Sequence, residues 1–378
     1  MHSALILGIE SSCDETAAAV VRDGRDVLSN AVFSQVATHL AYGGVVPELA
    51  SREHLRAIAP IVRRAMEEAS TTYADLDAIA VTQGPGLAGA LLVGITFAKA
   101  LAFGLQKPLI AVNHIEGHIH AVLLELAHAQ VEPEYPILAL VVSGGHTHLY
   151  VVSRDADAGL IYRYRPVGRT LDDAAGEAFD KVAKLLGFPY PGGPVIDALA
   201  RYGNAKAVKF ALSQVKEKIY REARTAVDEQ TAFSFSGIKT AVLRYVELNP
   251  DLKEGISARQ RSGATSVDGL RELTDPKTLD LIASFQHAVV SDLVTKTMRA
   301  AEKHEVRSLL VTGGVAANSG LREKFTQNAA ERGYPVYFPS RTLSTDNAAM
   351  IAAAAYPKLM RGEFADAHFS AEPTLALR

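Results

Sequence analysis

One pattern of apolar runs and polar turns occurs twice along this chain. In the first copy, apolar runs at 5–10 and 17–21 flank a polar turn at 11–16, and a third run follows at 27–33. In the second copy, runs at 137–142 and 149–152 flank a turn at 143–148, and a third run spans 160–166. Short apolar runs between polar turns predict strands. The repeat therefore predicts two similar halves that face each other across a cleft.

Helices and further strands follow each copy. Helical periodicity or composition predicts helices at 47–69, 91–103 and 345–359, and one that starts at 114, whereas buried strands are expected at 76–81, 109–112, 307–311 and 336–338. A chain of 378 residues exceeds one ordinary core, so two domains are expected. The fold class is α/β.

Composition narrows the class of protein. With 48% hydrophobic and 21% charged residues and no low-complexity tract, the chain belongs to the soluble globular class. Cys13 is the single cysteine, which excludes an intrachain disulfide, and no leader precedes the first strand. A cytoplasmic protein is expected. The apolar segment 87–105 contains Lys99, so a buried helix is favoured over a membrane span. A net charge of −3 gives no basic footprint for nucleic acid.

The stretch Asn113-His114-Ile115-Glu116-Gly117-His118 combines three side chains that can bind metal. On a helix, His114 and His118 differ by about 40° around the axis and about 6 Å along it, so both imidazoles can reach one ion. Glu116 lies about 200° around the axis and points away. In zinc peptidases of the His-Glu-x-x-His type, the Glu follows the first His directly. The alternative interpretation is a polar helix start with hydrogen-bonded histidines.

Glycine-rich loops follow or separate apolar runs at Gly84, Gly144, Gly192 and Gly313. Glycines let a ligand approach the backbone closely, and free N–H groups in such turns bind anions. Nucleotide or phosphate binding is one interpretation, and ordinary turns are the other. Neither a Gly-x-x-x-x-Gly-Lys-Ser/Thr loop nor a Gly-x-Gly-x-x-Gly loop that opens a βαβ unit is present.

Ten motifs span nearly the whole chain and are specific as a set: IESSCDET (9–16), YGGVVPELASREH (42–54), GPGLAGALLVG (84–94), NHIEGH (113–118), LVVSGGHTHL (140–149), DDAAGEAFDKVAKLLG (172–187), YPGGP (190–194), FSFSGIKT (233–240), GGVAAN (313–318) and STDNAAMIA (344–352). Together they resemble one family, the TsaD family of tRNA N6-adenosine threonylcarbamoyltransferases, formerly labelled glycoprotease or O-sialoglycoprotein endopeptidase.

The resemblance implies an actin-like ATPase (ASKHA) fold, in which two lobes, each with a mixed sheet flanked by helices, enclose a cleft. The first lobe is expected at 1–134, with the C-terminal helix and tail, 345–378, packed back on it. The second is expected at 135–344, with a helical insert at about 170–280. The segment 247–276 is longer and more polar than the family leads us to expect, which predicts a flexible insertion.

The resemblance also implies site residues. A divalent metal, Fe²⁺ in the family with Zn²⁺ or Mg²⁺ as alternatives, is expected on His114, His118 and Asp346. Asp14 and Glu15, placed in the first hairpin turn, are the candidates for assisting transfer. The substrate threonylcarbamoyl-adenylate is expected along Val141, Val142, Ser143, Gly144, Gly145, Asp180, Gly193, Asp197 and Asn318.

The implied activity is acyl transfer from L-threonylcarbamoyl-adenylate to N6 of the adenosine beside the anticodon, position 37, in tRNAs that read codons beginning with A. The implied partners are tRNA and TsaB-like and TsaE-like subunits, without a membrane. Two alternatives stay open: an ATPase or kinase of the same fold, and a metallopeptidase. The peptidase is disfavoured because Ile115 stands where its general base would be.

Overall fold

The computed structural model describes residues 3–155, 160–210, 229–366 and 368–378. Packing divides the chain into two compact units. Unit 1 contains residues 1–135, 152–164 and 339–378, and unit 2 contains residues 136–151 and 165–338. Residues 211–228 of the expected helical insert lie outside the described residues.

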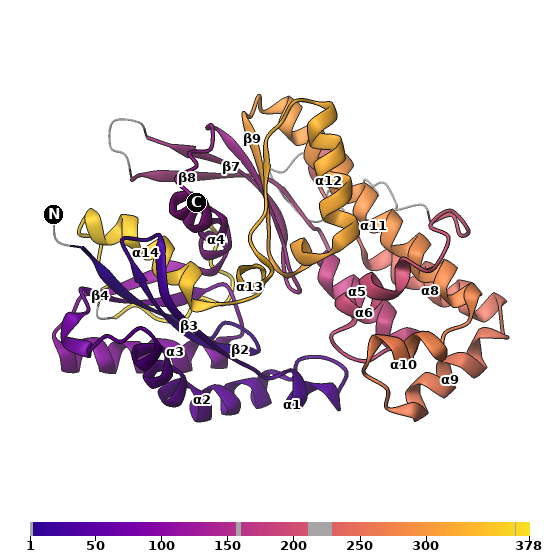
Figure 1. The fold of residues 1–378 in the computed structure, drawn as a ribbon, viewed down its shortest axis with the longest axis horizontal. Helices are drawn as coiled ribbons and strands as arrows, with labels where there is room; N and C mark the ends of the chain where they lie inside the picture. The colour runs from indigo at the N-terminus through magenta and orange to yellow at the C-terminus, as the bar shows by residue number, and fades with distance from the viewer. Residues whose placement is uncertain (1–2, 156–159, 211–228, 367) are drawn as a thin grey trace. The chain divides into compact units, whose positions relative to one another are not determined.

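Unit 1 is built on a mixed five-stranded sheet (Figure 1). Its strand order is β3-β2-β1-β4-β5, with β1 at Leu5–Glu10, β2 at Glu15–Arg22, β3 at Asp26–Ser34, β4 at Ala78–Gly84 and β5 at Leu109–Asn113. The first three strands pair antiparallel through short turns, as the repeated pattern predicted. The pairs β1–β4 and β4–β5 are parallel, which requires the helical crossovers between them.

Helices cover both faces of this sheet, and its strands are therefore continuous runs of apolar residues. Along β1, Leu7 and Ile9 pack with α2 (Pro47–Glu68) and α3 (Ala88–Leu105). Ile6 packs on the other face with α4 (His114–His128) and the alanine-rich α14 (Ala348–Met360). At Gly8 a Cβ would lie 2.3 Å from the carbonyl oxygen of Ala348, so α14 lies directly against the strand.

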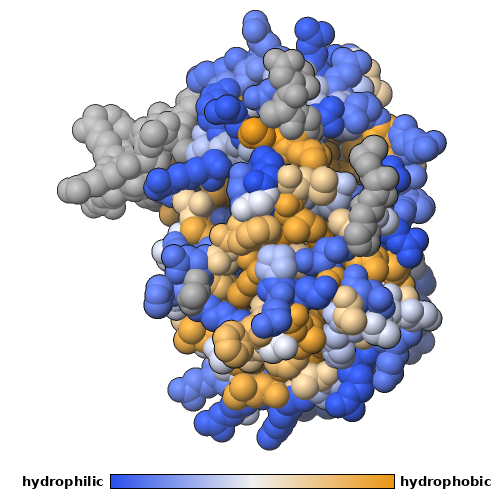
Figure 2. Space-filling model, turned by 90° about the vertical axis from the view of Figure 1, so that its left-hand side faces the viewer, coloured by the Kyte–Doolittle hydropathy of each residue, from blue (hydrophilic) through white to orange (hydrophobic). Residues whose placement is uncertain are grey.

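Among the described residues, α3 is the one helix long and apolar enough to cross a membrane. Leu91, Ile95 and Ala98 on α3 pack against the sheet in the core of unit 1, but only 33% of the helix is buried, less than the sequence led us to expect. Phe103 on the same helix is 88% exposed. On the face drawn in Figure 2, hydrophilic side chains lie between the hydrophobic ones. Apolar atoms are common on the exposed surface of folded proteins.

Unit 2 contains a second five-stranded sheet, in the order β10-β9-β6-β7-β8. Its strands are β6 (Ile137–Val142), β7 (Thr147–Arg154), β8 (Tyr162–Arg169), β9 (Ser308–Thr312) and β10 (Val336–Tyr337). The pairs β6–β9 and β9–β10 are parallel. Alternate residues of β6, Leu138, Leu140 and Val142, share a core with the long helix α11 (Pro276–Lys303) and with α12 (Ser319–Glu331).

Shorter elements complete the two units. They are α1 (Val36–Leu40), η1 (Tyr73–Asp75), α5 (Ala175–Leu185), α6 (Gly192–Ala200), η2 (Glu229–Thr231), α8 (Ser236–Leu248), α9 (Leu252–Ser262), α10 (Val267–Glu272), η3 (Gly314–Ala317) and α13 (Arg341–Ser344).

The predicted flexible insertion at 247–276 is wrong, because most of it is helical. Arg259 on α9 is 2% exposed. Its Nε donates to the carbonyl oxygen of Leu186 (2.9 Å), and its Nη1 donates to that of Leu273 (3.0 Å). These carbonyls end α5 and α10, where a cation is favourable. Arg259 therefore ties the segment to the rest of unit 2.

Candidate active site

The two histidines lie at the start of α4. The helix begins at His114 because Asn113 caps it: Asn113 Oδ1 accepts hydrogen bonds from the backbone N–H groups of Ile115 (2.9 Å) and Glu116 (3.4 Å). His118 follows one turn later, and the ring centroids of the two histidines are 4.7 Å apart. Both side chains are buried, with 3% and 0% exposure for His114 and His118.

Asp346 completes the group. The sequence predicted a helix from 345, but α14 starts at Ala348 because Asn347 caps it through Met350 N. Asp346 therefore lies in the turn before α14. Its Oδ1 is 3.6 Å from His114 Nε2 and 3.3 Å from His118 Nε2.

These distances fit a shared metal ion. The three ligand atoms lie within 4.8 Å of one another. An ion bonded at about 2.0–2.2 Å to imidazole nitrogen and carboxylate oxygen places neighbouring ligand atoms roughly 3–3.5 Å apart. Two imidazoles and one carboxylate leave open coordination positions, as in Fe²⁺ and catalytic Zn²⁺ sites. The buried group can hold a metal.

Glu10, at the end of β1, supports His114 from the other side. Its Oε2 is 3.0 Å from His114 Nδ1 and accepts a hydrogen bond from Thr82 Oγ1 at 2.7 Å. Burial raises the pKa of Glu10, but the charge and hydrogen bond of His114 outweigh burial and lower it. Burial lowers the pKa of His114, yet the carboxylates of Asp346 and Glu10 raise it to about 9. Sequence reasoning missed Glu10, although an acid that ends a buried apolar strand is a usable signal.

Of the two catalytic candidates expected in the first hairpin turn, Asp14 lies there and Glu15 does not. Asp14 lies in the turn after β1 and is 7% exposed, whereas Glu15 is the first residue of β2, not a turn residue. Burial and the charges of Asp14 and Asp346 raise the pKa of Glu15 well above its usual value. Burial likewise raises the pKa of the Cys13 thiol, which keeps this side chain protonated and a poor nucleophile.

A buried histidine that the sequence did not single out holds this turn. His54 on α2 is 0% exposed. Its Nε2 is 2.9 Å from the carbonyl oxygen of Cys13, and its Nδ1 is 2.7 Å from Thr16 Oγ1. Because a carbonyl only accepts, Nε2 carries the proton and Nδ1 accepts from the threonine hydroxyl. His54 therefore holds the residues on both sides of Asp14 and Glu15, Cys13 through its backbone and Thr16 through its side chain.

Glu116 points away from the two histidines, as the helical geometry predicted. Its Oε2 lies 2.9 Å from Lys358 Nζ on α14, and its Oε1 accepts from the Tyr164 hydroxyl at 3.4 Å. A carboxylate held in this way cannot act as base on water bound at the metal group.

In unit 2, five of the substrate candidates lie at the end of β6 and in the turn that joins β6 to β7. Val141 and Val142 are fully buried in β6, directly before the turn. Ser143 accepts a backbone hydrogen bond from Gly176, at the start of α5 (3.2 Å). Gly144 and Gly145 are exposed, and a Cβ on either would meet nothing within 4 Å. The backbone at these two glycines is therefore open to a ligand.

A second glycine turn lies against the same strand. Gly313 has φ +94°, and a Cβ there would lie 2.4 Å from the carbonyl oxygen of Val142. Only glycine fits this approach. The next residue, Gly314, has nothing within 4 Å of its Cβ position.

The remaining four substrate candidates lie around α6 and the start of α12. Asp180 Oδ1 accepts from Gly192 N (2.7 Å), so it caps α6. Asp197 Oδ2 accepts from Ser319 N at 3.0 Å. Asn318 Nδ2 donates to Gln286 Oε1 (2.9 Å), and Gln286 Nε2 donates to Asp197 Oδ1 (3.3 Å). Gln286 and Ser319, which the sequence did not indicate, therefore join Asp197 and Asn318 in one network. At Gly193 a Cβ would have Phe179 Cβ, at 3.9 Å, as its nearest contact, so the position is open.

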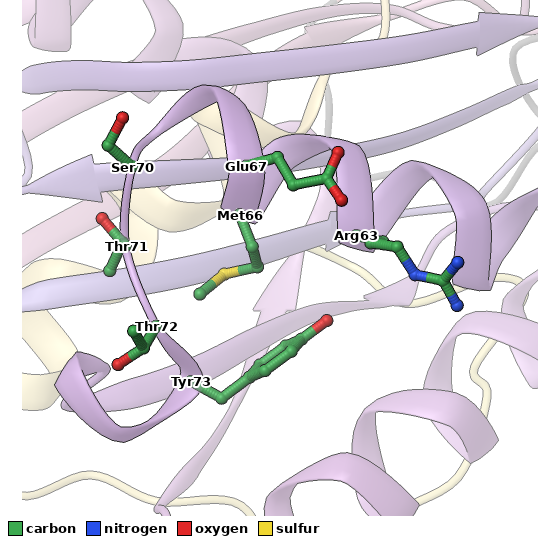
Figure 3. A pocket seen from close by; sticks show the side chains of 7 residues that line it. All are labelled: Arg63, Met66, Glu67, Ser70, Thr71, Thr72 and Tyr73. Carbon is green, nitrogen blue, oxygen red and sulfur yellow. The ribbon is translucent and has the colours of Figure 1, made fainter.

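A hollow of about 420 Å³ lies elsewhere in unit 1, at the end of α2 (Figure 3). None of the site residues named above contributes to it. It is lined by Arg63, Met66, Glu67, Ser70, Thr71, Thr72 and Tyr73.

Two mixed sheets flanked by helices, with the buried His-His-Asp group, define an α/β protein of the actin-like ATPase (ASKHA) class. Solved structures agree on the fold. Full-length HypF in a phosphate- and nucleotide-bound form aligns with a TM-score of 0.54 at 12% identity, covering 96% of this chain and 47% of that one. HypF of T. kodakarensis gives a TM-score of 0.54 at 14% identity, with 96% and 49% covered.

Sequence comparison gives the family. The family model described as "TsaD: tRNA N6-adenosine threonylcarbamoyltransferase" matches residues 26–353. The tRNA N6-adenosine threonylcarbamoyltransferase of Koribacter versatilis (strain Ellin345) is 60% identical over 385 residues, covering 100% of both chains. That of Geotalea uraniireducens (strain Rf4) is 50% identical over 348 residues, covering 92% of this chain and 89% of the relative.

The chain belongs to the TsaD family of tRNA N6-adenosine threonylcarbamoyltransferases. It is an acyltransferase that forms N6-threonylcarbamoyladenosine in tRNA.

Proposed function

We propose that His114, His118 and Asp346 hold one divalent metal ion, Fe²⁺ in preference to Zn²⁺ or Mg²⁺, for the transfer of the threonylcarbamoyl group to tRNA. The observation that carries the assignment is the convergence of three ligand atoms within 4.8 Å in a buried site. Glu10 supports it, since a carboxylate on the far nitrogen of a histidine is the usual partner of a metal-bound imidazole. When bound, such an ion polarises carbonyl or phosphate oxygens.

The donor of the group is L-threonylcarbamoyl-adenylate, and unit 2 binds it. Its phosphate lies on the open backbone of Gly144 and Gly145, next to Ser143, whose own N–H donates to the carbonyl oxygen of His146 (2.8 Å). Asp180 and Asp197 bind hydroxyl groups of the ribose. The remaining contacts come from the backbone of Val141 and Val142, from the open position at Gly193 and from Asn318.

The chemistry is direct transfer. The N6 amine of adenosine attacks the carbamoyl carbon, the bond from that carbon to the phosphate oxygen breaks, and AMP leaves. The amine is a weak nucleophile, so positioning and the removal of its proton limit the step. Asp14 and Glu15 assist there, and His54 keeps their turn in place.

The partners follow from membership of the family. Besides tRNA and the adenylate, we assign TsaB-like and TsaE-like subunits, and the cytoplasm as the compartment. We propose that no membrane takes part, which is supported by the packing of Leu91, Ile95 and Ala98 of α3 on the sheet of unit 1.

One experiment separates this function from its rivals. The pure chain, with the partner subunits, is incubated with synthetic threonylcarbamoyl-adenylate and unmodified tRNA. Parallel reactions contain ATP alone or a peptide. We expect modified tRNA and AMP in the first reaction only. Turnover of ATP alone would favour an ATPase or kinase, and peptide cleavage would favour a peptidase. Either result without tRNA modification would overturn the proposal.

A further inference from the structure

Helices α4 and α14 pack against each other (Figure 1). The residues of the proposed metal site lie in the first turns of α4, which hold His114 and His118, and just before α14, where Asp346 lies. The helices meet at Gly117, where a Cβ would lie 2.9 Å from Ile351 Cδ1 and 3.2 Å from Met350 Cγ. The way α4 lies on α14 therefore determines how far the histidines are from the aspartate.

An ion pair joins the same two helices on the other side of α4. Lys358, in the last turn of α14, places its Nζ 2.9 Å from Glu116 Oε2 and 3.1 Å from the carbonyl oxygen of Ala111 on β5. The side chains of Lys358 and Glu116 are 21% and 10% exposed. Because both side chains are largely removed from water, this pair is screened less than an exposed ion pair, and loss of one member leaves the other charge without its partner.

Glu116 is held by a second donor. The Tyr164 hydroxyl donates to Glu116 Oε1 at 3.4 Å, and His120 Nε2 lies 2.9 Å from the Tyr164 oxygen. Since the tyrosine proton points to Glu116, the Tyr164 oxygen accepts from His120 Nε2–H. Both carboxylate oxygens of Glu116 thus have donors from different elements, which fixes the first turn of α4.

We propose that Lys358 and Glu116 are positioning residues of the transferase. Their ion pair holds α4 against α14 and β5, and it thereby sets the distance of His114 and His118 from Asp346. The inference rests on the metal site proposed above. Neither residue contacts a ligand atom, so both act through the helices that carry the ligands.

The test measures Co²⁺ binding to the metal-free full chain, with a competing chelator to obtain the dissociation constant. The visible spectrum of bound Co²⁺ reports ligand geometry, which a merely stabilising residue would not change. We expect Lys358→Met to weaken binding about 10–100-fold, the range for residues that orient metal ligands, and to alter the spectrum. Glu116→Gln removes the charge but leaves an amide oxygen that can accept from Lys358, and it should weaken binding less.

Lys277→Met is the matched control. Lys277 pairs with Asp251 at 3.0 Å, but the two side chains are 39% and 62% exposed and belong to unit 2. This variant should bind Co²⁺ as the unmodified chain does. Thermal unfolding of each metal-free variant shows whether it is folded, and Lys358→Gln, which removes the charge but can still donate a hydrogen bond, replaces Lys358→Met if the latter does not fold.

A double-mutant cycle separates positioning from general loosening. If Lys358 acts by placing Asp346 against the histidines, Lys358→Met should have little effect in a chain that already carries Asp346→Ala. An equal loss in both backgrounds, or a Lys358→Met chain with normal Co²⁺ affinity and spectrum, would overturn the inference. Absence of Co²⁺ binding to the unmodified chain would instead overturn the metal assignment, and this inference with it.

Discussion

Glu10 Oε2 lies 3.0 Å from His114 Nδ1, so the last residue of β1 holds the first residue of α4. Glu10 is 0% exposed and also receives hydrogen bonds from Ser12 N (2.5 Å) and Thr82 Oγ1 (2.7 Å). With Nδ1 committed to Glu10, the imidazole presents Nε2 to Asp346. The central strand of unit 1 thus fixes both the orientation and the tautomer of a metal-ligand candidate.

Glu10→Gln should therefore reduce metal affinity without removing a ligand. The amide keeps the volume but loses the charge that makes the imidazole a stronger ligand. We expect the metal dissociation constant to rise about 10–100-fold. Competition with a chelator measures it. An unchanged constant in a folded variant would mean that Glu10 is only a core hydrogen-bond partner.

His114→Ala and His118→Ala remove ligands directly. Each should lose bound metal and transfer activity while the fold persists, because each change removes one ligand from a preformed site. His128→Ala is the control: it lies on the same helix, but its side chain is 69% exposed and pairs with Asp26. Elemental analysis gives the metal content. Full occupancy in the double variant His114→Ala/His118→Ala would refute the assignment.

Gly144→Val and Gly193→Val should block threonylcarbamoyl-adenylate with little change in thermal stability. A Cβ at Gly144 meets nothing within 4 Å, and at Gly193 the nearest atom is 3.9 Å away. Gly104→Val on α3 is the control, since its Cβ position is also empty. Calorimetric titration with the adenylate measures affinity. If both site variants bind as tightly as the control, the ligand does not lie along these glycines.

Substitutions at Asp180, Asp197 and Asn318 test ligand binding less directly than the sequence suggested. Each already accepts a backbone hydrogen bond at a helix start, from Gly192, Ser319 and Leu321 respectively. Alanine there removes a cap worth about 0.5–2 kcal/mol as well as any ligand contact. Their effects on affinity must be compared with their effects on unfolding.

Glu116→Gln distinguishes transferase from peptidase. Loss of a general base costs roughly 10²–10⁴-fold in rate. Glu116 instead pairs with Lys358 and Tyr164, and the amide oxygen of glutamine can still accept from Lys358. We expect transfer to fall by less than about tenfold, with metal retained. A collapse of the initial rate of transfer at normal metal content would show that Glu116 turns into the site.

His148 makes stability depend on pH. Burial first, and then the charge of Arg169, lower its pKa to about 4. The unfolded chain binds a proton near pH 6.5, so stability is complete above that pH and is lost as the pH falls towards 4. For this half-buried ring the loss is about 2–3 kcal/mol. Urea unfolding at pH 7.5 and 4.5 should show a smaller pH effect in His148→Gln than in His128→Gln. Equal pH effects would contradict this assignment.

The amino-acid sequence was enough to predict most strands, the fold class and the family. The run Ile137–Val142 was predicted to the residue, because six consecutive apolar residues between polar turns allow little else. The spacing of His114 and His118 fixed their common face and the opposite direction of Glu116, since both follow from 3.6 residues per turn. Ten motifs along the chain carried the resemblance that sequence comparison confirms.

Which side chains meet depends on tertiary packing. Glu10 reaches His114, and Lys358 reaches Glu116, because packing brings the ends of β1, α4 and α14 together. The segment around Arg259 looked flexible by composition, yet two helix ends bind its guanidinium and order it. No local pattern encodes such contacts. They depend on distances between elements far apart in the chain, and only a packed core fixes those distances.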